Sequence, residues 1–261
     1  MVRSADILLE DVIRLAEAAG ARINEIYETT FAVGRKADAS PVTAADHEAE
    51  ALIVQGLAAL TPDIPIVAEE AMARGTCPAI ADRFWLVDPL DGTKEFINRI
   101  GDFTVNIALI EAGTPVLGVV HIPVSGESFA AAGRGAATRR KRGGAVQSIA
   151  ARTPHADGVV VLTSRFHADQ RKLDAFLEEC PAMQGRKVRE CKVAGSALKF
   201  CLIAAGEADL YPRLGPTMEW DTAAGHALIL GAGGSVETLD GNPLRYGKPD
   251  FLNSGFVARG R

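Results

Sequence analysis

Near the middle of its N-terminal half, the chain reads Trp85-Leu86-Val87-Asp88-Pro89-Leu90-Asp91-Gly92-Thr93-Lys94-Glu95-Phe96. Residues 84–87 form an apolar run with the length of a buried strand. Asp88-Pro89 is expected to end that strand, because proline fixes its own φ and removes a backbone hydrogen-bond donor. The segment therefore predicts a strand followed at once by a turn.

That turn carries two carboxylates three residues apart, Asp88 and Asp91. Gly92 permits a backbone conformation that other residues resist, and Thr93 stands where a short helix can start. We expect a rigid turn with both carboxylates and the Leu90 carbonyl on one side. These are hard oxygen ligands of the kind that Mg²⁺ prefers.

Two more acidic segments lie far from this turn in the sequence. Glu69-Glu70 ends the preceding predicted strand, and Glu219-Trp220-Asp221 opens a predicted helix. Taken alone, each acidic feature has a local explanation as a turn, a solvated strand end or a helix N-terminal anion. If Glu69, Asp88, Asp91 and Asp221 converge, however, each pair about 4 Å apart repels by about 4 kcal/mol at an effective dielectric of about 20. Several such pairs would cancel a stability of about 5–15 kcal/mol, so convergence implies bound divalent cations.

Hydrophobic periodicity predicts helices over residues 4–28 and 43–60. The second helix starts at Thr43-Ala44-Ala45-Asp46, an acidic variant of the capping box. Strands are expected over residues 64–68, 84–87, 103–111, 114–122 and 127–132, in a largely antiparallel sheet. Residues 134–144, rich in Arg, Lys and Gly, are expected to form an exposed connection that borders the two halves of the chain.

The second half alternates between strands and helices. Strands are predicted over residues 158–163, 187–191, 208–211 and 235–238, and helices over residues 169–179, 196–205 and 220–230. Such alternation favours a layered α/β unit with a mixed or parallel sheet. The chain therefore divides into an α+β half, residues 1–140, which carries most of the acidic ligands, and an α/β half, residues 141–261, which carries Asp221.

Composition excludes several classes of protein. The net charge of −5 over 261 residues argues against broad binding to nucleic acid or anionic membranes, although a bound metal allows an anionic small substrate. Residues 1–10 lack the pattern of a secretory signal, and no apolar stretch approaches the length of a membrane span. The four cysteines form no C-x-x-C pair and are expected to stay reduced. We expect a cytoplasmic protein, with peripheral attachment at the inner membrane and the oligomeric state left open.

The acidic motifs resemble those of the lithium-sensitive, Mg²⁺-dependent phosphatase superfamily of inositol monophosphatases, fructose bisphosphatases and bisphosphate nucleotidases. The resemblance rests on Asp-Pro-Leu-Asp-Gly-Thr at 88–93 and on Trp220-Asp221. It is closer to the 3′(2′),5′-bisphosphate nucleotidases of the CysQ type, and is carried further by residues 40–46, 85–97, 101–111, 195–201, 211–213 and 220–227. It implies a layered αβαβα sandwich of the inositol monophosphatase and fructose bisphosphatase type.

The resemblance also implies the roles of the site residues. Glu69, Asp88, Asp91, Asp221 and the Leu90 carbonyl would hold two or three Mg²⁺. Asp46 and Thr93 would orient and deprotonate the attacking water, with Glu69 beside them. The main-chain N–H groups of Gly92 and Thr93 would hold phosphate oxygens at a helix start.

Substrate contacts are implied for His167, Ser196, Lys199 and Arg213. Ser196 at a helix start and Lys199 one turn later would share a face towards a phosphate, and Arg213 offers a fork for a second phosphate. Each has a simpler explanation as a loop or surface residue. Ala197 departs from the second serine that is common in relatives, which leaves the rank of substrates open.

The expected reaction is hydrolysis of the 3′-phosphate of adenosine 3′,5′-bisphosphate, and of its sulfated form, as part of sulfur metabolism. Two alternatives remain at this point. One is an inositol monophosphatase-like phosphatase of sugar or polyol phosphates, and the other is a metal- or nucleotide-binding module without turnover.

Overall fold

The computed structural model describes residues 4–36, 41–165, 169–180, 183 and 185–261. Its larger sheet has seven strands in the order β3-β4-β5-β6-β7-β8-β9. Only β3 and β4 pair in parallel, so the prediction of a largely antiparallel sheet is confirmed. The strands are β3 Ile66–Ala68, β4 Arg83–Asp91, β5 Thr104–Glu111, β6 Thr114–Ile122, β7 Glu127–Ala132, β8 Thr138–Lys141 and β9 Gln147–Ser148.

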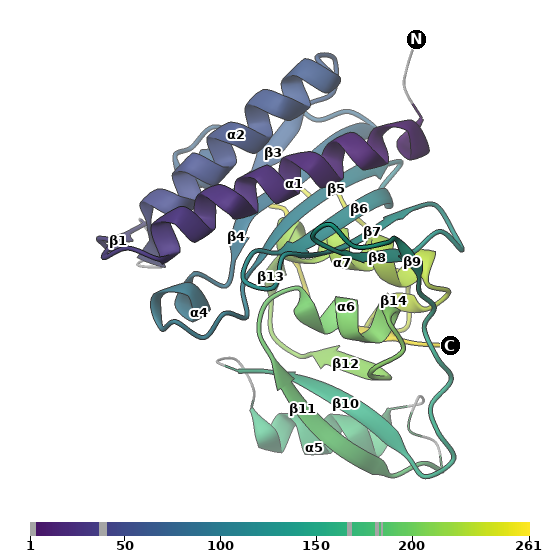
Figure 1. The fold of residues 1–261 in the computed structure, drawn as a ribbon. Coiled ribbons are helices and arrows are strands. Elements are labelled where there is room, and N and C mark those ends of the chain that lie inside the picture. The colour runs from purple at the N-terminus through teal and green to yellow at the C-terminus, as the bar shows by residue number, and fades with distance from the viewer. Residues whose placement is uncertain (1–3, 37–40, 166–168, 181–182, 184) are drawn as a thin grey trace.

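Helices cover both faces of this sheet. The long helices α1 (Ala5–Tyr27) and α2 (Ala44–Leu60) lie on one face, and α7 (Glu219–Gly231) lies on the other (Figure 1). Successive residues of a strand point to opposite faces, so Trp85 packs with α1 and α2 while Phe84 packs with α7. Both faces are buried, which explains why β4 and β5 read as continuous apolar runs rather than as alternating patterns.

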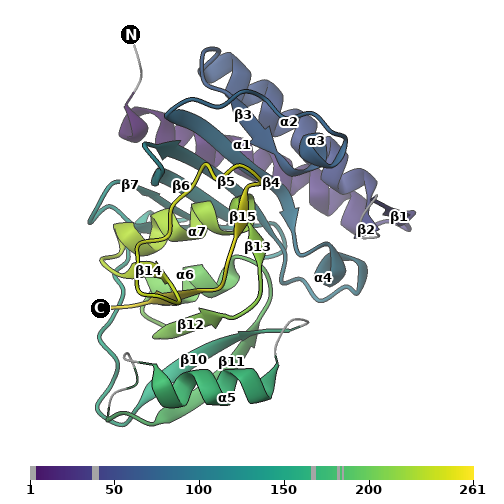
Figure 2. The ribbon, with the colours of Figure 1, turned by 180° about the vertical axis from the view of Figure 1, so that it is seen from behind.

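A second, five-stranded sheet has the order β11-β10-β12-β16-β14 and mixes parallel with antiparallel pairs. Helix α6 (Leu198–Ala204) lies with α7 between the two sheets, and α5 (Gln170–Glu179) covers the outer face (Figures 1 and 2). The layers thus run α, β, α, β, α, as the sequence predicts. The strands are β10 Val159–Ser164, β11 Val188–Ala194, β12 Leu210–Arg213, β14 Ser235–Thr238 and β16 Phe256–Arg259.

Short elements complete the fold around the junction of the two sheets. Strands β1 (Gly34–Arg35) and β2 (Pro41–Val42) form one small pair, and β13 (Thr217–Met218) and β15 (Leu252–Asn253) form another. Helices α3 (Glu69–Ala73) and α4 (Thr93–Ile97) each follow a strand of the large sheet. Within the described residues, no helix combines the length and apolarity needed to cross a bilayer. The division of the chain at residue 140 stays a prediction.

Two expectations about elements were wrong, and one strand of the five-stranded sheet was not foreseen. Strand β4 does not end at Asp88-Pro89, because its pairing with β5 resumes at Asp91 after a shift of register, and proline is tolerated at such a bulge. Residues 138–141 form strand β8 rather than an exposed connection, with Arg139 paired to Glu127 and Arg140 to Glu17. Strand β16, which lies between β12 and β14, was not predicted.

The close packing of α7 against β6 predicts the effect of one substitution. A methyl group on Gly118 would lie 2.4 Å from the Ala224 carbonyl oxygen and 2.6 Å from Ala227 Cβ, both on α7. Gly118→Ala should therefore lower the free energy of unfolding by about 1–3 kcal/mol, seen as a lower Tm in a thermal melt. Gly215→Ala, at a position with open space around the added carbon, is the control and should change the Tm little. Equal melting temperatures would contradict this close packing.

Candidate active site

The turn predicted after residues 84–87 is a bulge within β4 that hydrogen bonds hold in place. Asp88 pairs with Asn106 and Asp91 with Thr104, so β4 carries one residue more than β5 between these pairs. The Leu90 main-chain N–H donates to Asp88 Oδ1 at 3.0 Å. Gly92 follows with φ of 98°, a conformation that favours glycine. The bulge thus holds both carboxylates and the intervening carbonyl in a fixed arrangement.

The structure brings the four predicted acidic side chains together. Asp88 is buried and hydrogen-bonded to Glu69, and its pKa is raised first by desolvation and then by repulsion from Glu69, Asp91 and Asp221. Desolvation likewise raises the pKa of Asp91 to about 6. The pKa of Asp221 is raised by desolvation and by Asp91 and Glu69. Each carboxylate therefore lies within the field of the others.

Asp221, which is distant in sequence from the other three carboxylates, reaches this cluster from the first turn of α7. Asp221 Oδ2 accepts a hydrogen bond from the Met218 main-chain N–H at 2.9 Å, which fixes the side chain against the first turn. Glu219, fully buried, accepts from the main-chain N–H groups of Gly247 at 2.7 Å and Lys248 at 3.0 Å. These bonds anchor the start of α7, so the position of Asp221 depends on the loop that precedes β15.

One lysine partly compensates the acidic cluster. Lys36 Nζ lies 2.6 Å from Glu69 Oε1 and 2.5 Å from Glu70 Oε1. Desolvation disfavours its charge, but the two carboxylates outweigh that effect and raise its pKa. The pKa of Glu70 is raised to about 7, chiefly by burial. Lys36 therefore faces more negative charge than its one ammonium group can balance.

Thr93 and Asp46 are hydrogen-bonded, although they come from different helices. Asp46 Oδ2 accepts from the main-chain N–H and the hydroxyl of Thr43, both at 2.7 Å, which is the predicted capping box. Its other oxygen, Oδ1, accepts from Thr93 Oγ1 at 3.3 Å. The same hydroxyl lies 3.4 Å from the Leu90 carbonyl oxygen. Burial raises the pKa of Asp46, which makes this carboxylate a better proton acceptor.

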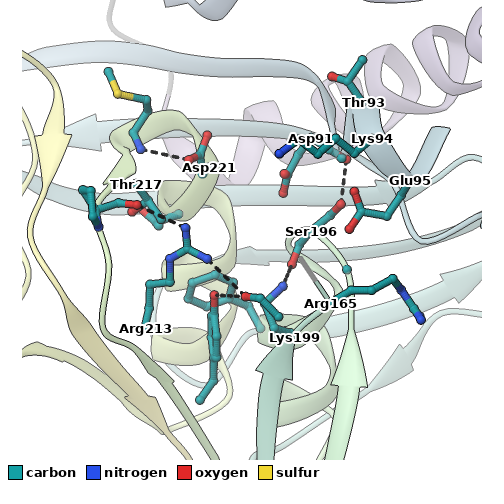
Figure 3. A pocket seen from close by; sticks show the side chains of 18 of the residues that line it. Asp91, Thr93, Lys94, Glu95, Arg165, Ser196, Lys199, Arg213, Thr217 and Asp221 are labelled. Atoms are coloured by element: carbon teal, nitrogen blue, oxygen red, sulfur yellow. Dashed lines mark hydrogen bonds between the residues drawn. The ribbon is translucent and has the colours of Figure 1, made fainter. Parts of the chain in front are cut away.

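A cavity of about 480 Å³ opens over these groups. Asp91, Thr93 and Asp221 line it on one side, and Arg165, Lys199 and Arg213 line it on the other (Figure 3). Glu69, Gly92 and Ser196 also line the cavity, whereas Asp88 and Leu90 are buried. The cavity therefore has an acidic end and a basic end.

The structure places the predicted substrate contacts differently from the sequence-based expectation. Helix α6 begins at Leu198, so Ser196 precedes it, in a left-handed conformation with φ of 47°. Ser196 Oγ lies 2.8 Å from the carbonyl oxygens of both Asp91 and Asp102, and its single proton serves one of them at a time. The hydroxyl thus ties the turn after β11 to the turn after β4. The idea of a shared helical face with Lys199 was wrong.

Lys199 and Arg213 are held by carbonyl and hydroxyl groups at the basic end. Lys199 Nζ donates to the carbonyl oxygens of Ser196 at 2.7 Å and Ala194 at 3.2 Å, and the side chain is buried. Arg213 donates to Ser164 Oγ and to the Pro216 carbonyl oxygen, each at 3.2 Å. His167, and Ser40 of the motif before Asp46, lie outside the described residues.

Sequence reasoning missed several residues that line or support the site. Lys36 lies in the short segment after α1, where no periodic pattern marks it. Asp102 receives hydrogen bonds from Arg165 at 2.9 Å and from the Gly195 main-chain N–H at 3.3 Å, which joins the two halves of the chain. Glu95 stands within the quoted motif, yet only the cavity shows that it faces the site.

The donor set fits a hard divalent cation. Four carboxylates and a main-chain carbonyl meet here, and burial with mutual repulsion raises the pKa of Asp88, Asp91 and Asp221. Over the described ranges, no three acidic, His or Cys side chains already stand in positions that enclose an ion. Glu69 turns towards Lys36 and Asp221 towards the Met218 N–H, so these two side chains would have to turn to share an ion with Asp88 and Asp91.

Comparisons with known proteins agree with this geometry. The inositol monophosphatase family model matches residues 6–260. The chain belongs to the inositol monophosphatase family. Its relatives include the 3′(2′),5′-bisphosphate nucleotidase CysQ of Escherichia coli (strain K12), 46% identical over 95% of this chain and 98% of the relative.

Solved structures of the same family share the architecture. CysQ from Bacteroides thetaiotaomicron, a bacterial member of the inositol monophosphatase family, superposes with a TM-score of 0.78 at 36% identity over 96% of each chain. An inositol monophosphatase from Anabaena superposes with a TM-score of 0.73 at 28% identity, over 97% of this chain and 90% of that one. The layered fold of the inositol monophosphatase family is thereby confirmed.

The raised carboxylate pKa values predict how divalent ions act on stability. The pKa of Asp91 is about 6 in the folded chain, above its ordinary value, so the folded state holds its proton longer than the unfolded state. This carboxyl therefore favours folding at low pH and disfavours it as pH rises through about 6, unless a cation binds. The increase in Tm that saturating Mg²⁺ produces should grow between about pH 5 and pH 7.5.

Melting curves with Mg²⁺ and with a chelator at each pH would measure this increase. Burial lowers the pKa of His121 to about 4 and that of His226 to about 3, which makes the chain without metal more stable as pH rises. The difference between the two curves removes that contribution. A Tm increase that is independent of pH would contradict binding by these carboxylates.

Proposed function

We propose that the chain is a Mg²⁺-dependent 3′(2′),5′-bisphosphate nucleotidase. It hydrolyses the 3′-phosphate of adenosine 3′,5′-bisphosphate to give AMP and phosphate, and converts 3′-phosphoadenylyl sulfate to adenylyl sulfate in the same way. The observation that carries the proposal is the meeting of Glu69, Asp88, Asp91 and Asp221 beside the Thr93–Asp46 pair, at one end of a cavity whose other end is basic. The CysQ names of the relatives that match nearly the whole chain support it.

Two or three Mg²⁺ at Glu69, Asp88, Asp91, Asp221 and the Leu90 carbonyl would neutralise the phosphate dianion, acidify a water molecule and stabilise the leaving oxygen. The residues of this chain then have separate tasks. The buried carboxylates would hold these ions, and through them the phosphate, at the acidic end of the cavity. Gly92 and Thr93, which line the cavity there, contribute main-chain N–H groups.

The Thr93–Asp46 pair moves the proton of the attacking water. Thr93 Oγ1 faces the cavity and has a lone pair for a proton from water, while it donates its own proton to Asp46 Oδ1. Asp46 is suited to receive that proton because burial raises its pKa. The oxygen of water then bonds to phosphorus as the bond from phosphorus to the ribose O3′ breaks, and O3′ takes up a proton from solvent to become the free hydroxyl of AMP.

The basic end of the cavity favours a substrate with a second phosphate. Arg165, Lys199 and Arg213 lie there, opposite the carboxylates, with Ser196 between the two ends (Figure 3). An inositol monophosphate has one phosphate, which the acidic end with its metal ions would hold, and it has no second anionic group to place at the basic end. A nucleoside 3′,5′-bisphosphate satisfies both ends. This is why we place the nucleotide before the polyol phosphates.

A panel of phosphate esters tests the proposal. Phosphate release should require Mg²⁺, and kcat/KM should be greater for adenosine 3′,5′-bisphosphate than for inositol 1-phosphate. Asp91→Asn, which weakens a ligand without changing its size, should reduce turnover by about two orders of magnitude or more. Its Tm in chelator at pH 7.5 should be at or above that of the wild type, because the substitution removes a buried charge whose pKa is raised. A preference for inositol 1-phosphate would favour the polyol phosphatase, and no release from any ester would favour a binding module without turnover.

The proton path predicts opposite outcomes for two substitutions of one residue. Thr93→Val keeps the shape of the side chain but removes the hydroxyl that bridges water and Asp46, so kcat should fall by about 10²–10⁴-fold. Thr93→Ser keeps the hydroxyl and should retain most of the activity. Steady-state kinetics at saturating Mg²⁺ would measure both. Similar losses in the two variants would exclude the hydroxyl as the proton carrier.

A further inference from the structure

Glu95 is the residue in the cavity wall whose presence the reaction does not explain. Its side chain lines the cavity on the first turn of α4, on the same side as Asp91 and Thr93 (Figure 3). The residue is only 7% exposed. Among the described residues, its carboxylate has no hydrogen-bond partner except its own main-chain N–H. A site built to bind phosphate thus contains an acceptor that phosphate would repel.

The nearby cations are engaged elsewhere. Lys199 Nζ donates to the carbonyl oxygens of Ser196 and Ala194, and Arg165 donates to Asp102 Oδ2 at 2.9 Å. Burial raises the pKa of Glu95, as expected for a carboxyl that lacks a strong partner. Within the described residues, the Glu95 oxygens are not among the side-chain atoms that are buried without a partner, so they open onto the cavity and can accept a hydrogen bond from a ligand there.

Glu95 lies near the reacting end of the cavity. Its carboxylate is close enough to Asp91 to raise the pKa of that residue, and Oε1 lies 3.0 Å from the position that a Cβ on Gly195 would take. Whatever meets Glu95 must therefore be near the phosphate that is cleaved and must carry a hydrogen-bond donor. In a nucleoside 3′-phosphate, the donor next to that phosphate is the ribose 2′-hydroxyl, whereas the amino group of the base lies farther away.

We propose that Glu95 accepts a hydrogen bond from the sugar hydroxyl adjacent to the cleaved phosphate and thereby selects ribonucleotides over deoxyribonucleotides. The inference rests on the proposed nucleotidase activity and adds a specificity-determining residue to it. A carboxylate acceptor discriminates strongly, because an analogue without the hydroxyl leaves the buried charge without a partner.

The test compares adenosine 3′,5′-bisphosphate with its 2′-deoxy analogue. Loss of one hydrogen bond to a charged acceptor should make kcat/KM of the wild type about 10- to 100-fold higher for the ribonucleotide. Glu95→Ala should bring this ratio close to one. Glu95→Gln, which keeps an acceptor oxygen but loses the charge, should give an intermediate ratio. Any effect of Glu95 on the metal site applies to both substrates and cancels in the ratio.

Two controls keep the test decisive. Glu28→Gln removes a charge at an exposed position at the end of α1, outside the cavity, and should leave the ratio unchanged. The binding of AMP and 2′-deoxy-AMP, measured by calorimetry, should show the same preference in the wild type and its loss in Glu95→Ala. A ratio near one in the wild type, or a ratio that Glu95→Ala does not change, would overturn the inference. Absence of phosphate release from both substrates in the wild type would instead overturn the nucleotidase proposal itself.

Discussion

Carboxylates that share a poorly solvated site cannot all stay ionised unless a cation lies among them. Asp88, Asp91 and Asp221 meet this condition, since desolvation and mutual repulsion raise the pKa of each. The fold nevertheless holds these three side chains close together. A bulge fixes the first two, and a buried helix start anchored through Glu219 fixes the third. Such precise placement of mutually repelling groups is sensible in a protein that binds divalent ions.

The two sheets of the fold meet at this point. Asp88 and Asp91 come from the large sheet. Asp221 and Arg213 come from α7 and β12 of the second half, and Ser196 from the turn between β11 and α6. Ser196 and Asp102 connect the halves through hydrogen bonds with the opposite main chain. A cavity formed this way can place an acidic end and a basic end within reach of one small molecule. The geometry therefore links metal binding to the recognition of a substrate with two anionic groups.

Many of the helices, strands and acidic site residues could be predicted from local sequence. The predictions that failed did so for physical reasons. The long helices and the strands with continuous apolar runs were recognisable because burial on both faces leaves a clear pattern. The prediction for β4 ended too early, because proline usually ends a strand. The bulge that accommodates Pro89 depends on pairing with β5, which the local sequence does not show. Strand β8 was missed because its arginines read as solvated, and their partners Glu10, Glu17, Glu127 and Glu207 are distant in sequence. The acidic side chains were found from motifs, but Lys36 and Glu95 depend on tertiary contacts alone.

The central claim is that Glu69, Asp88, Asp91 and Asp221 together hold divalent ions. Anomalous X-ray scattering from crystals grown with Mn²⁺, a substitute for Mg²⁺ that can be located by its own signal, tests it most directly. We expect at least two ion peaks between these side chains and the Leu90 carbonyl oxygen, with Lys36 displaced from Glu69. Ions bound elsewhere, with the Lys36–Glu69 contact intact, would contradict the account.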